Sequence, residues 1–212
     1  MCRNLARIAS AVATSYVKTT VGGQPYRTER GLVDMLFKVA AHPRVSIASI
    51  GIETIPLVLD PSNSIVREAL PVLQRRAIIP HEVTGNRVEL QTESFSDISF
   101  EDFRDFREHV LTDALVSCWK TDGRGFFDSC TSAVEEFCAK GSSVSVSLFL
   151  EAAIFCIEAV GDTVMSSHQP FAQTEQLKRC TQALASRPDS LLASPLTLSR
   201  MATMLQKVCI LI

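Results

Sequence analysis

The sequence predicts an all-α protein, because apolar residues recur at three- and four-residue steps along most of the chain. Residues Phe100–Trp119 give the clearest case. The apolar stripe of this segment consists of Phe100, Phe103, Phe106, Val110 and Ala114. The opposite side carries Glu101, Asp102, Arg104, Asp105, Arg107 and Glu108. An isolated helix of about 30 Å cannot bury such a stripe, so neighbouring helices are expected.

The start of this helix has its own signal. Ser99 precedes it and Asp102 follows three residues later, which predicts a shortened version of the Ser-x-x-Glu capping box. Early carboxylates also suit the positive end of the helix dipole.

Four helices are expected before this segment, and glycine or proline marks their ends. They span Leu5–Lys18, Arg27–Ala41, Val45–Leu59 and Ile65–Ala77. Gly22 and Gly23 end the first, and Pro43 prevents the second from continuing. Pro56 lies inside the third pattern, so that helix should kink or finish early.

Residues 78–99 show no helical face. Arg87–Thr92 alternate weakly, but a single pair of such short strands would be marginal. The prediction is an extended loop from Ile78 to Ser99, with no convincing strand anywhere in the chain.

Further helices are expected after Gly123, at Gly125–Lys140, Val144–Met165, Pro170–Ser186 and from Ser194-Pro195 through Val208. Val144–Met165 is apolar almost all round, so we expect it to be covered on several sides. Its carboxylates Glu151 and Glu158 are seven residues apart and share one face. The apolar end Val208–Ile212 suggests a truncated chain.

These patterns predict about nine helices that follow one another in pairs, roughly 40 residues a pair, in which very apolar and amphipathic helices alternate. Such an order is typical of an α-solenoid of HEAT- or armadillo-type helical hairpins, an alpha-alpha superhelix. We therefore expect residues 1–212 to form a single HEAT-like repeat array, as a fragment of a longer solenoid. A single globular helical bundle is the alternative.

Composition narrows the classes of partner. The chain is 46% apolar and 21% charged, which indicates a packed soluble protein, and its formal charge is only -2. No basic run is present, so we expect no nucleic-acid partner. A secretory leader and a long uncharged apolar run are also missing, so we expect no membrane partner. The seven cysteines occur singly, which favours reduced thiols in an intracellular protein.

No catalytic, cofactor-binding or metal-binding residue is predicted. The histidines are His42, His81, His109 and His168, and only His109 has acidic neighbours at helical spacing, Asp105 and Asp113. Such pairs are more often surface contacts than ligands. The sequence contains no phosphate loop, no His-Glu-x-x-His and no Gly-x-Ser-x-Gly. An enzyme is therefore not expected; a helical enzyme or small-molecule binder would need a closed pocket with perturbed polar groups.

Four segments resemble the middle repeats of nuclear transport receptors: Cys2–Val12, Leu32–Pro43, Asp102–Val110 and Phe149–Gly161. The match is to the importin-beta (karyopherin-beta) superfamily, in its transportin-SR and importin-thirteen branch. Phe149 stands where the family usually has tryptophan. The resemblance implies protein cargo, the Ran GTPase and nucleoporins as partners, and shuttling between nucleus and cytoplasm. The repeats that engage Ran in this family are not among those matched.

Candidate protein contacts are Glu101, Asp102 and Asp105 on one helix side, together with the loop Pro80–Ser99. A solvated outer face is the favoured interpretation of these acids, because exposed carboxylates on a helix usually contact only water. A HEAT or armadillo scaffold unrelated to transport would have the same fold and would lack Ran or nucleoporin binding.

Overall fold

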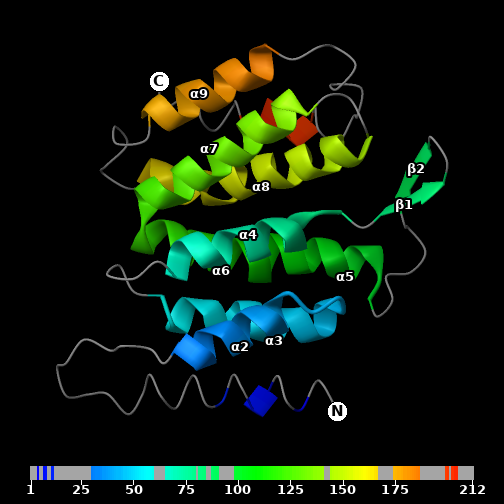
Figure 1. Ribbon diagram of the computed structural model, residues 1–212, viewed down its shortest axis with the longest axis vertical. Coiled ribbons are helices and arrows are strands. Elements are labelled where there is room, and N and C mark those ends of the chain that lie inside the picture. Colours follow the sequence, from blue (N-terminus) through cyan, green and yellow to red (C-terminus); the bar gives the residue numbers. More distant parts are fainter. Residues whose placement is uncertain are drawn as a thin grey trace. The chain divides into compact units, whose positions relative to one another are not determined.

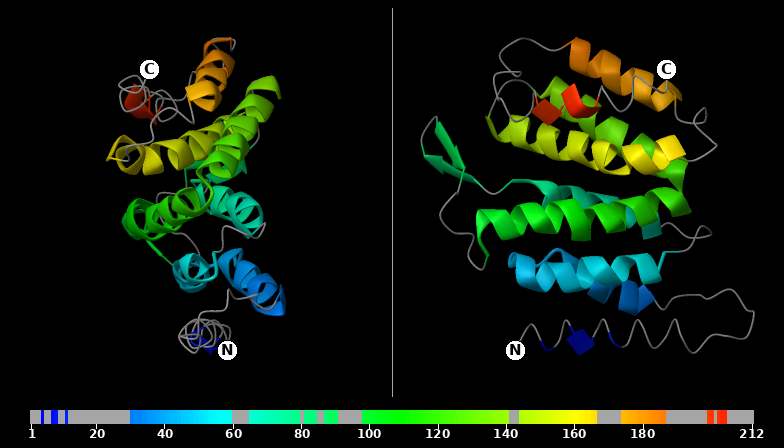
Figure 2. Two further views of the ribbon diagram at one scale, coloured as in Figure 1. Left: turned by 90° about the vertical axis from the view of Figure 1, so that its left-hand side faces the viewer. Right: turned by 180° about the vertical axis from the view of Figure 1, so that it is seen from behind.

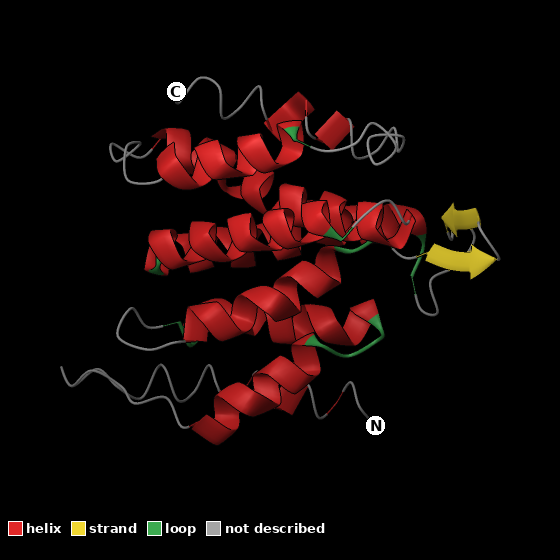
Figure 3. Cartoon of the chain, turned by 45° about the horizontal axis from the view of Figure 1, so that its top comes forward, coloured by secondary structure: helices red, strands yellow, loops and turns green. Residues whose placement is uncertain are grey.

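The computed structural model describes residues 4, 7, 8, 11, 30–59, 65–79, 81–84, 87–90, 98–140, 144–166, 174–186, 199, 200 and 202–204. Almost all of these residues are helical, as Figures 1 and 3 show, so the all-α class is confirmed apart from one small hairpin. The chain divides into two compact units. One contains Met1–Arg76 with Thr92–Thr121, and the other contains Ala77–Gln91 with Asp122–Ile212.

The helix boundaries follow the sequence signals closely. In the first unit the elements are α2 (Arg30–Ala40), α3 (Val45–Thr54), the 3₁₀ turn η1 (Ile55–Leu57), α4 (Ile65–Ala77), α5 (Phe100–Asp105), the π-helical segment η2 (Phe106–Leu111) and α6 (Thr112–Thr121). Helix α3 finishes early, as expected, and Pro56 lies in the 3₁₀ turn that follows it. Of the expected first helix, Arg7, Ile8 and Ala11 are helical, as is Asn4 just before it, and the other residues of that helix lie outside the described ones.

Helix α3 is the centre of the first unit. It packs on α2 and also on the α5–η2–α6 helix. Its sequence is apolar on most sides for this reason, and Ile47, Ala48 and Ile52 are buried. Arg30 of α2 donates two hydrogen bonds to Glu68 of α4, at 2.8 and 2.5 Å, and so links these two helices. Figure 2 shows α4 lying beside the α5–η2–α6 helix.

The long amphipathic helix predicted at Phe100–Trp119 is present, but its middle is π-helical. The carbonyl of Arg107 accepts the backbone N–H of Thr112, five residues later, and the Thr112 hydroxyl donates to the same oxygen at 3.0 Å. Bonds of this span define a π turn, and such single turns inside α-helices often lie at functional sites.

Arg107 lies on the buried side of this helix, and its predicted place on the polar side is wrong. The charge pattern predicts Arg107 on the polar side, but only 4% of it is exposed. Position 107 falls in the row between Phe103 and Leu111, four residues from each, so helical geometry directs it inward. The long aliphatic part of an arginine side chain can pack among apolar neighbours. The prediction counted Arg107 only as a charged residue and so placed it on the polar side.

The second unit contains α7 (Gly123–Ala139), α8 (Val144–Ser166), α9 (Thr174–Ala185) and a short helical stretch at residues 199, 200 and 202–204. Helix α7 packs on both α8 and α9. Asp122 caps α7 by accepting the Gly125 N–H at 2.8 Å. The rest of the predicted last helix, and the apolar end Val208–Ile212, lie outside the described residues.

The prediction of an extended loop at residues 78–99 is wrong in part. His81–Thr84 form strand β1 and Arg87–Leu90 form strand β2, paired antiparallel with Val83 opposite Val88. The dipeptide between the strands is Gly85-Asn86, a combination typical of a two-residue hairpin loop. Contacts between β2 and α8 provide the support that an isolated hairpin would lack.

Among the described residues, no helix is both long enough and apolar enough to span a membrane.

Candidate functional site

The most unusual side-chain arrangement among the described residues lies on α8. Glu151, Phe155 and Glu158 occur at positions i, i+4 and i+7, so they line one face of this helix. All three are buried: residue exposures are 1%, 3% and 8%. Two carboxylates on a helix that is otherwise almost entirely apolar need a compensating cation.

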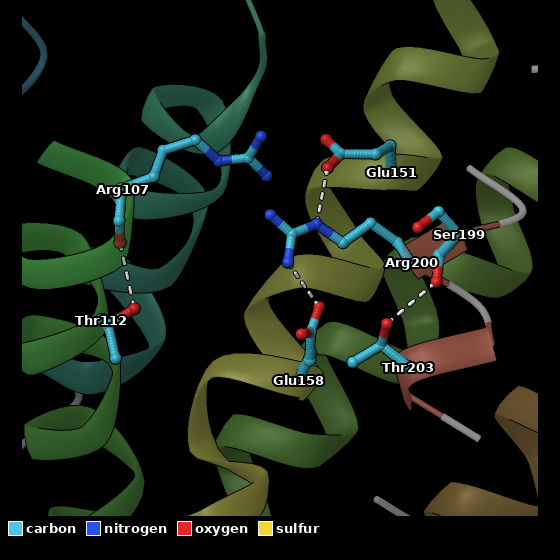
Figure 4. Close-up of polar contacts among 7 residues, drawn as sticks. All are labelled: Arg107, Thr112, Glu151, Glu158, Ser199, Arg200 and Thr203. Carbon is cyan, nitrogen blue, oxygen red and sulfur yellow. Dashed lines mark hydrogen bonds and ion pairs between the residues drawn. The ribbon is translucent and has the colours of Figure 1, made fainter. Parts of the chain in front are cut away.

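Arg200 supplies that cation from the short helical stretch near the end of the chain. Its Nε lies 3.3 Å from Oε1 of Glu151, and its Nη1 lies 2.9 Å from Oε2 of Glu158. Its guanidinium carbon stands 5.3 Å from the centre of the Phe155 ring. Figure 4 shows the guanidinium between the two carboxylates. We call Glu151, Phe155, Glu158 and Arg200 the α8 cluster.

The geometry suits arginine in particular. A planar guanidinium can donate to two carboxylates in a fixed geometry while its flat face stacks on an aromatic ring, whereas lysine offers a compact point charge without a flat face. The short helix is also tied together locally, because the Thr203 hydroxyl donates to the Ser199 carbonyl at 3.0 Å (Figure 4). The α8 cluster therefore ties the short helical stretch to α8 through Arg200.

The α8 cluster fixes how the short helical stretch lies on α8. Both carboxylates are engaged by a fixed cation, and the Arg200 side chain is only 29% exposed. Breaking a buried ion pair by removing one partner is costly, because the other charge is left uncompensated in a poorly solvated place.

The sequence pattern predicts that Glu151 and Glu158 share a face but does not identify their partner. Two acids on an apolar helix indicate that a cation lies opposite them. The sequence does not say which basic residue this is, because Arg200 lies 49 and 42 positions further along the chain.

The predicted contact residues Glu101, Asp102 and Asp105 all lie on the exposed side of α5. They therefore share a helix, as predicted, and Glu108 of η2 is exposed nearby. Glu101 makes a long, exposed ion pair with Arg104, at 3.8 Å. We call Glu101, Asp102, Asp105 and Glu108 the acidic face.

Asp102 also caps the start of α5. The predicted capping box is confirmed: Asp102 N–H donates to Ser99 Oγ at 3.1 Å, and Ser99 N–H donates back to Asp102 Oδ2 at 3.2 Å. The Ser99 hydroxyl also donates to Asp102 Oδ2 at 2.8 Å. These bonds, led by the hydroxyl, hold the pKa of Asp102 below its usual value.

The settings of His42, His109 and Cys118 do not favour reactivity. Within the described ranges, no group of three or more His, Cys, Asp or Glu could hold a metal ion. His109, with its acidic neighbours, is exposed on the long helix, and His42 accepts the Arg44 N–H at 3.1 Å. Burial raises the pKa of the Cys118 thiol to about 12, so it stays protonated near neutral pH. The absence of enzymatic activity stays a prediction.

The predicted contact loop Pro80–Ser99 contains the β1–β2 hairpin in the second unit. Among its residues, 80, 85, 86 and 91–97 lie outside the part that the structure describes.

No protein-family model, no curated protein and no solved structure matches this chain.

Proposed function

We propose that this chain is a protein-binding segment of a nuclear transport receptor of the importin-beta type. In this proposal it contributes to carrying protein cargo through the nuclear pore, in a cycle linked to Ran, and it shuttles between nucleus and cytoplasm. Binding is non-covalent, and small rotations between neighbouring helical hairpins accompany it.

The observation that carries the proposal is the pairing of consecutive helices. In the first unit the amphipathic α2 packs on the apolar α3, and in the second the amphipathic α7 packs on the apolar α8. In each case the apolar helix has further partners: η2 and α6 for α3, and β2 for α8. A hairpin that buries one helix on several sides is the unit from which helical repeat proteins are built.

The segments that resemble transport receptors fit this scheme. Leu32–Pro43 covers most of α2 and the turn that leads to α3. Asp102–Val110 covers the last part of α5 and most of η2, while Phe149–Gly161 lies inside α8. Glu151 and Glu158, whose carboxylates bind Arg200, both lie within the resembling segment Phe149–Gly161.

The acidic face is the proposed contact surface for cargo. Its carboxylates are exposed, and within the described part of the chain only the Asp102 capping box and the long Glu101–Arg104 pair engage them. Complementary charge mainly steers encounter and selects partners. A basic cargo segment is the partner that this face would attract.

A HEAT-type scaffold outside transport has the same helix pairing, so the fold does not separate the two functions. Binding to nucleoporin repeats rich in phenylalanine and glycine does. We expect the chain to be retained on such repeats and not on the same repeats with phenylalanine replaced by serine. No retention on either would contradict the transport proposal and leave the general scaffold.

The contact surface has its own test. The double variant Glu101→Gln/Asp105→Asn removes two charges and leaves the capping box in place. The control Glu53→Gln/Glu175→Gln removes two exposed charges from α3 and α9. We expect binding to a lysine- and arginine-rich peptide, measured at low salt, to weaken in the first variant only. Equal weakening in both would show that net charge, and no particular face, is responsible.

A further inference from the structure

The β1–β2 hairpin has an open strand edge. Among the described residues, its sheet consists of two strands and no third, as Figure 3 shows. In an antiparallel pair, alternate residues of each strand point their backbone N–H and C=O groups away from the partner strand. Strand β2 also packs on α8, whereas the main contact of β1 within the described elements is with β2. The edge of β1 is therefore the more open of the two.

The register of the hairpin places two residues of like charge directly opposite each other. Glu82 of β1 pairs with Glu89 of β2. Directly opposed like charges destabilise an antiparallel pair. Arg87 belongs to the same face, because it lies two positions from Glu89 and pairs with Thr84, which lies two positions from Glu82. One cation and two carboxylates leave this face with a net negative charge.

The other face of the hairpin is mainly apolar. It contains Val83 opposite Val88, and His81 opposite Leu90. A strand added to the sheet has to match both faces, because neighbours across strands interact in pairs on each face. The matching strand therefore alternates basic residues, for the charged face, with apolar residues, for the other.

We propose that the edge of β1 binds an extended segment of a partner protein as a third strand of this sheet. The segment has lysine or arginine at the position opposite Glu82 and apolar residues on either side of it. Backbone hydrogen bonds along the edge provide affinity, and the alternating residues provide specificity. The basic residue supplies the second cation that the Glu82–Glu89 face lacks.

This surface is distinct from the acidic face. The hairpin belongs to the second unit, and the acidic face belongs to the first. The strand-binding proposal does not depend on nuclear transport, because a general scaffold would recruit partners at the same edge.

Binding of a short labelled peptide that alternates valine and lysine, measured by fluorescence anisotropy with the whole chain, tests the proposal. We expect this peptide to bind and the corresponding valine–glutamate peptide not to bind. Two N-methylated forms of the first peptide test whether it binds as a strand. One carries the methyl groups on the valine amides and the other on the lysine amides. Because only alternate amides face β1, one form should lose binding and the other should keep it.

Variants test the position of the peptide. Glu82→Gln should weaken binding by up to about 5-fold, as expected for one cross-strand charge pair. Glu82→Lys should reverse the preference in favour of the valine–glutamate peptide. It also places opposite charges across the hairpin, which should keep the hairpin folded. Glu53→Gln, which removes an exposed charge from α3, should change nothing.

Several results would overturn the proposal. Failure of the valine–lysine peptide to bind is one, and binding that survives both methylated forms is another, since the peptide would then not be a strand. Equal weakening in Glu82→Gln and Glu53→Gln would leave net charge as the cause. Loss of binding in Glu101→Gln/Asp105→Asn alone would assign the peptide to the acidic face, which would refute strand addition and leave the proposed function standing.

Discussion

The backbone of α3 at Gly51 lies directly against the backbone of α2 at Ala40. A Cβ atom at position 51 would stand 2.6 Å from the Ala40 amide nitrogen and 3.0 Å from its Cα. Both neighbours are main-chain atoms and cannot rotate away. The close approach of this first helix pair therefore requires glycine at 51.

Gly51→Ala should destabilise the protein by about 1–3 kcal/mol, because the two helices must separate to admit the methyl group. Gly31→Ala is the matched control: it lies on α2, and no atom stands within 4 Å of its added Cβ. The control should be neutral or stabilise by up to about 1 kcal/mol, since alanine favours helix. Chemical denaturation measures both, and equal effects would contradict the close packing.

Arg200→Met should cost about 3–5 kcal/mol, because Glu151 and Glu158 would lose the cation that compensates them. Urea unfolding at neutral pH is the measurement. The triple variant Glu151→Met/Glu158→Leu/Arg200→Met removes all three charges and should recover most of the loss. A loss below about 0.5 kcal/mol for Arg200→Met alone, within the range of ordinary surface changes, would mean that the α8 cluster does not hold the short helix in solution.

Asp102→Asn should weaken the start of α5 in a pH-dependent way. Bonds from Ser99 lower the folded-state pKa of Asp102 beneath its ordinary value of 3.8. The stabilisation is therefore present above pH 3.8 and is lost as the pH falls through the lowered folded-state value. Thermal melts should separate wild type from Asp102→Asn at pH 7, and the two curves should converge in stronger acid.

Asp105→Asn is the control for that experiment, because it leaves the capping box intact. If Asp105→Asn and Asp102→Asn differed from wild type by the same amount at each pH, the capping box would not be the cause.

Phe106→Ala should cost about 3–5 kcal/mol, as expected for a large buried aromatic side chain. Phe106 is 5% exposed and its ring lies 5.9 Å from that of Phe103, centre to centre. Met35→Ala is the comparison, since Met35 is 40% exposed and should lose less than about 0.5 kcal/mol. A loss under about 1 kcal/mol for Phe106→Ala in chemical denaturation would place that side chain at the surface.

Local signals predicted local structure well. The Ser99 and Asp102 pair predicted the capping box, and the apolar period of Ile65–Ala77 predicted α4 with the bounds that the structure has. These features depend on residues a few positions apart, which a sequence displays directly.

Features that depend on distant residues were not predicted. Three such features depend on which helices pack together. They are the burial of Arg107, the π turn beside it and the ion pair of Arg200 with Glu151. The β1–β2 hairpin is too short to be stable alone and so was not predicted, although its Gly85-Asn86 dipeptide was a usable signal. Its contacts with α8 come from the tertiary structure, so no local rule could have included them.

The most direct measurement on the proposed function is capture of partners from nuclear extract by the full gene product that contains this segment, with and without Ran loaded with GTP. We expect a set of bound proteins that Ran-GTP releases or recruits, and loss of the set with Glu101→Gln/Asp105→Asn. A partner set indifferent to Ran-GTP would contradict a transport receptor and would leave a general helical-repeat scaffold.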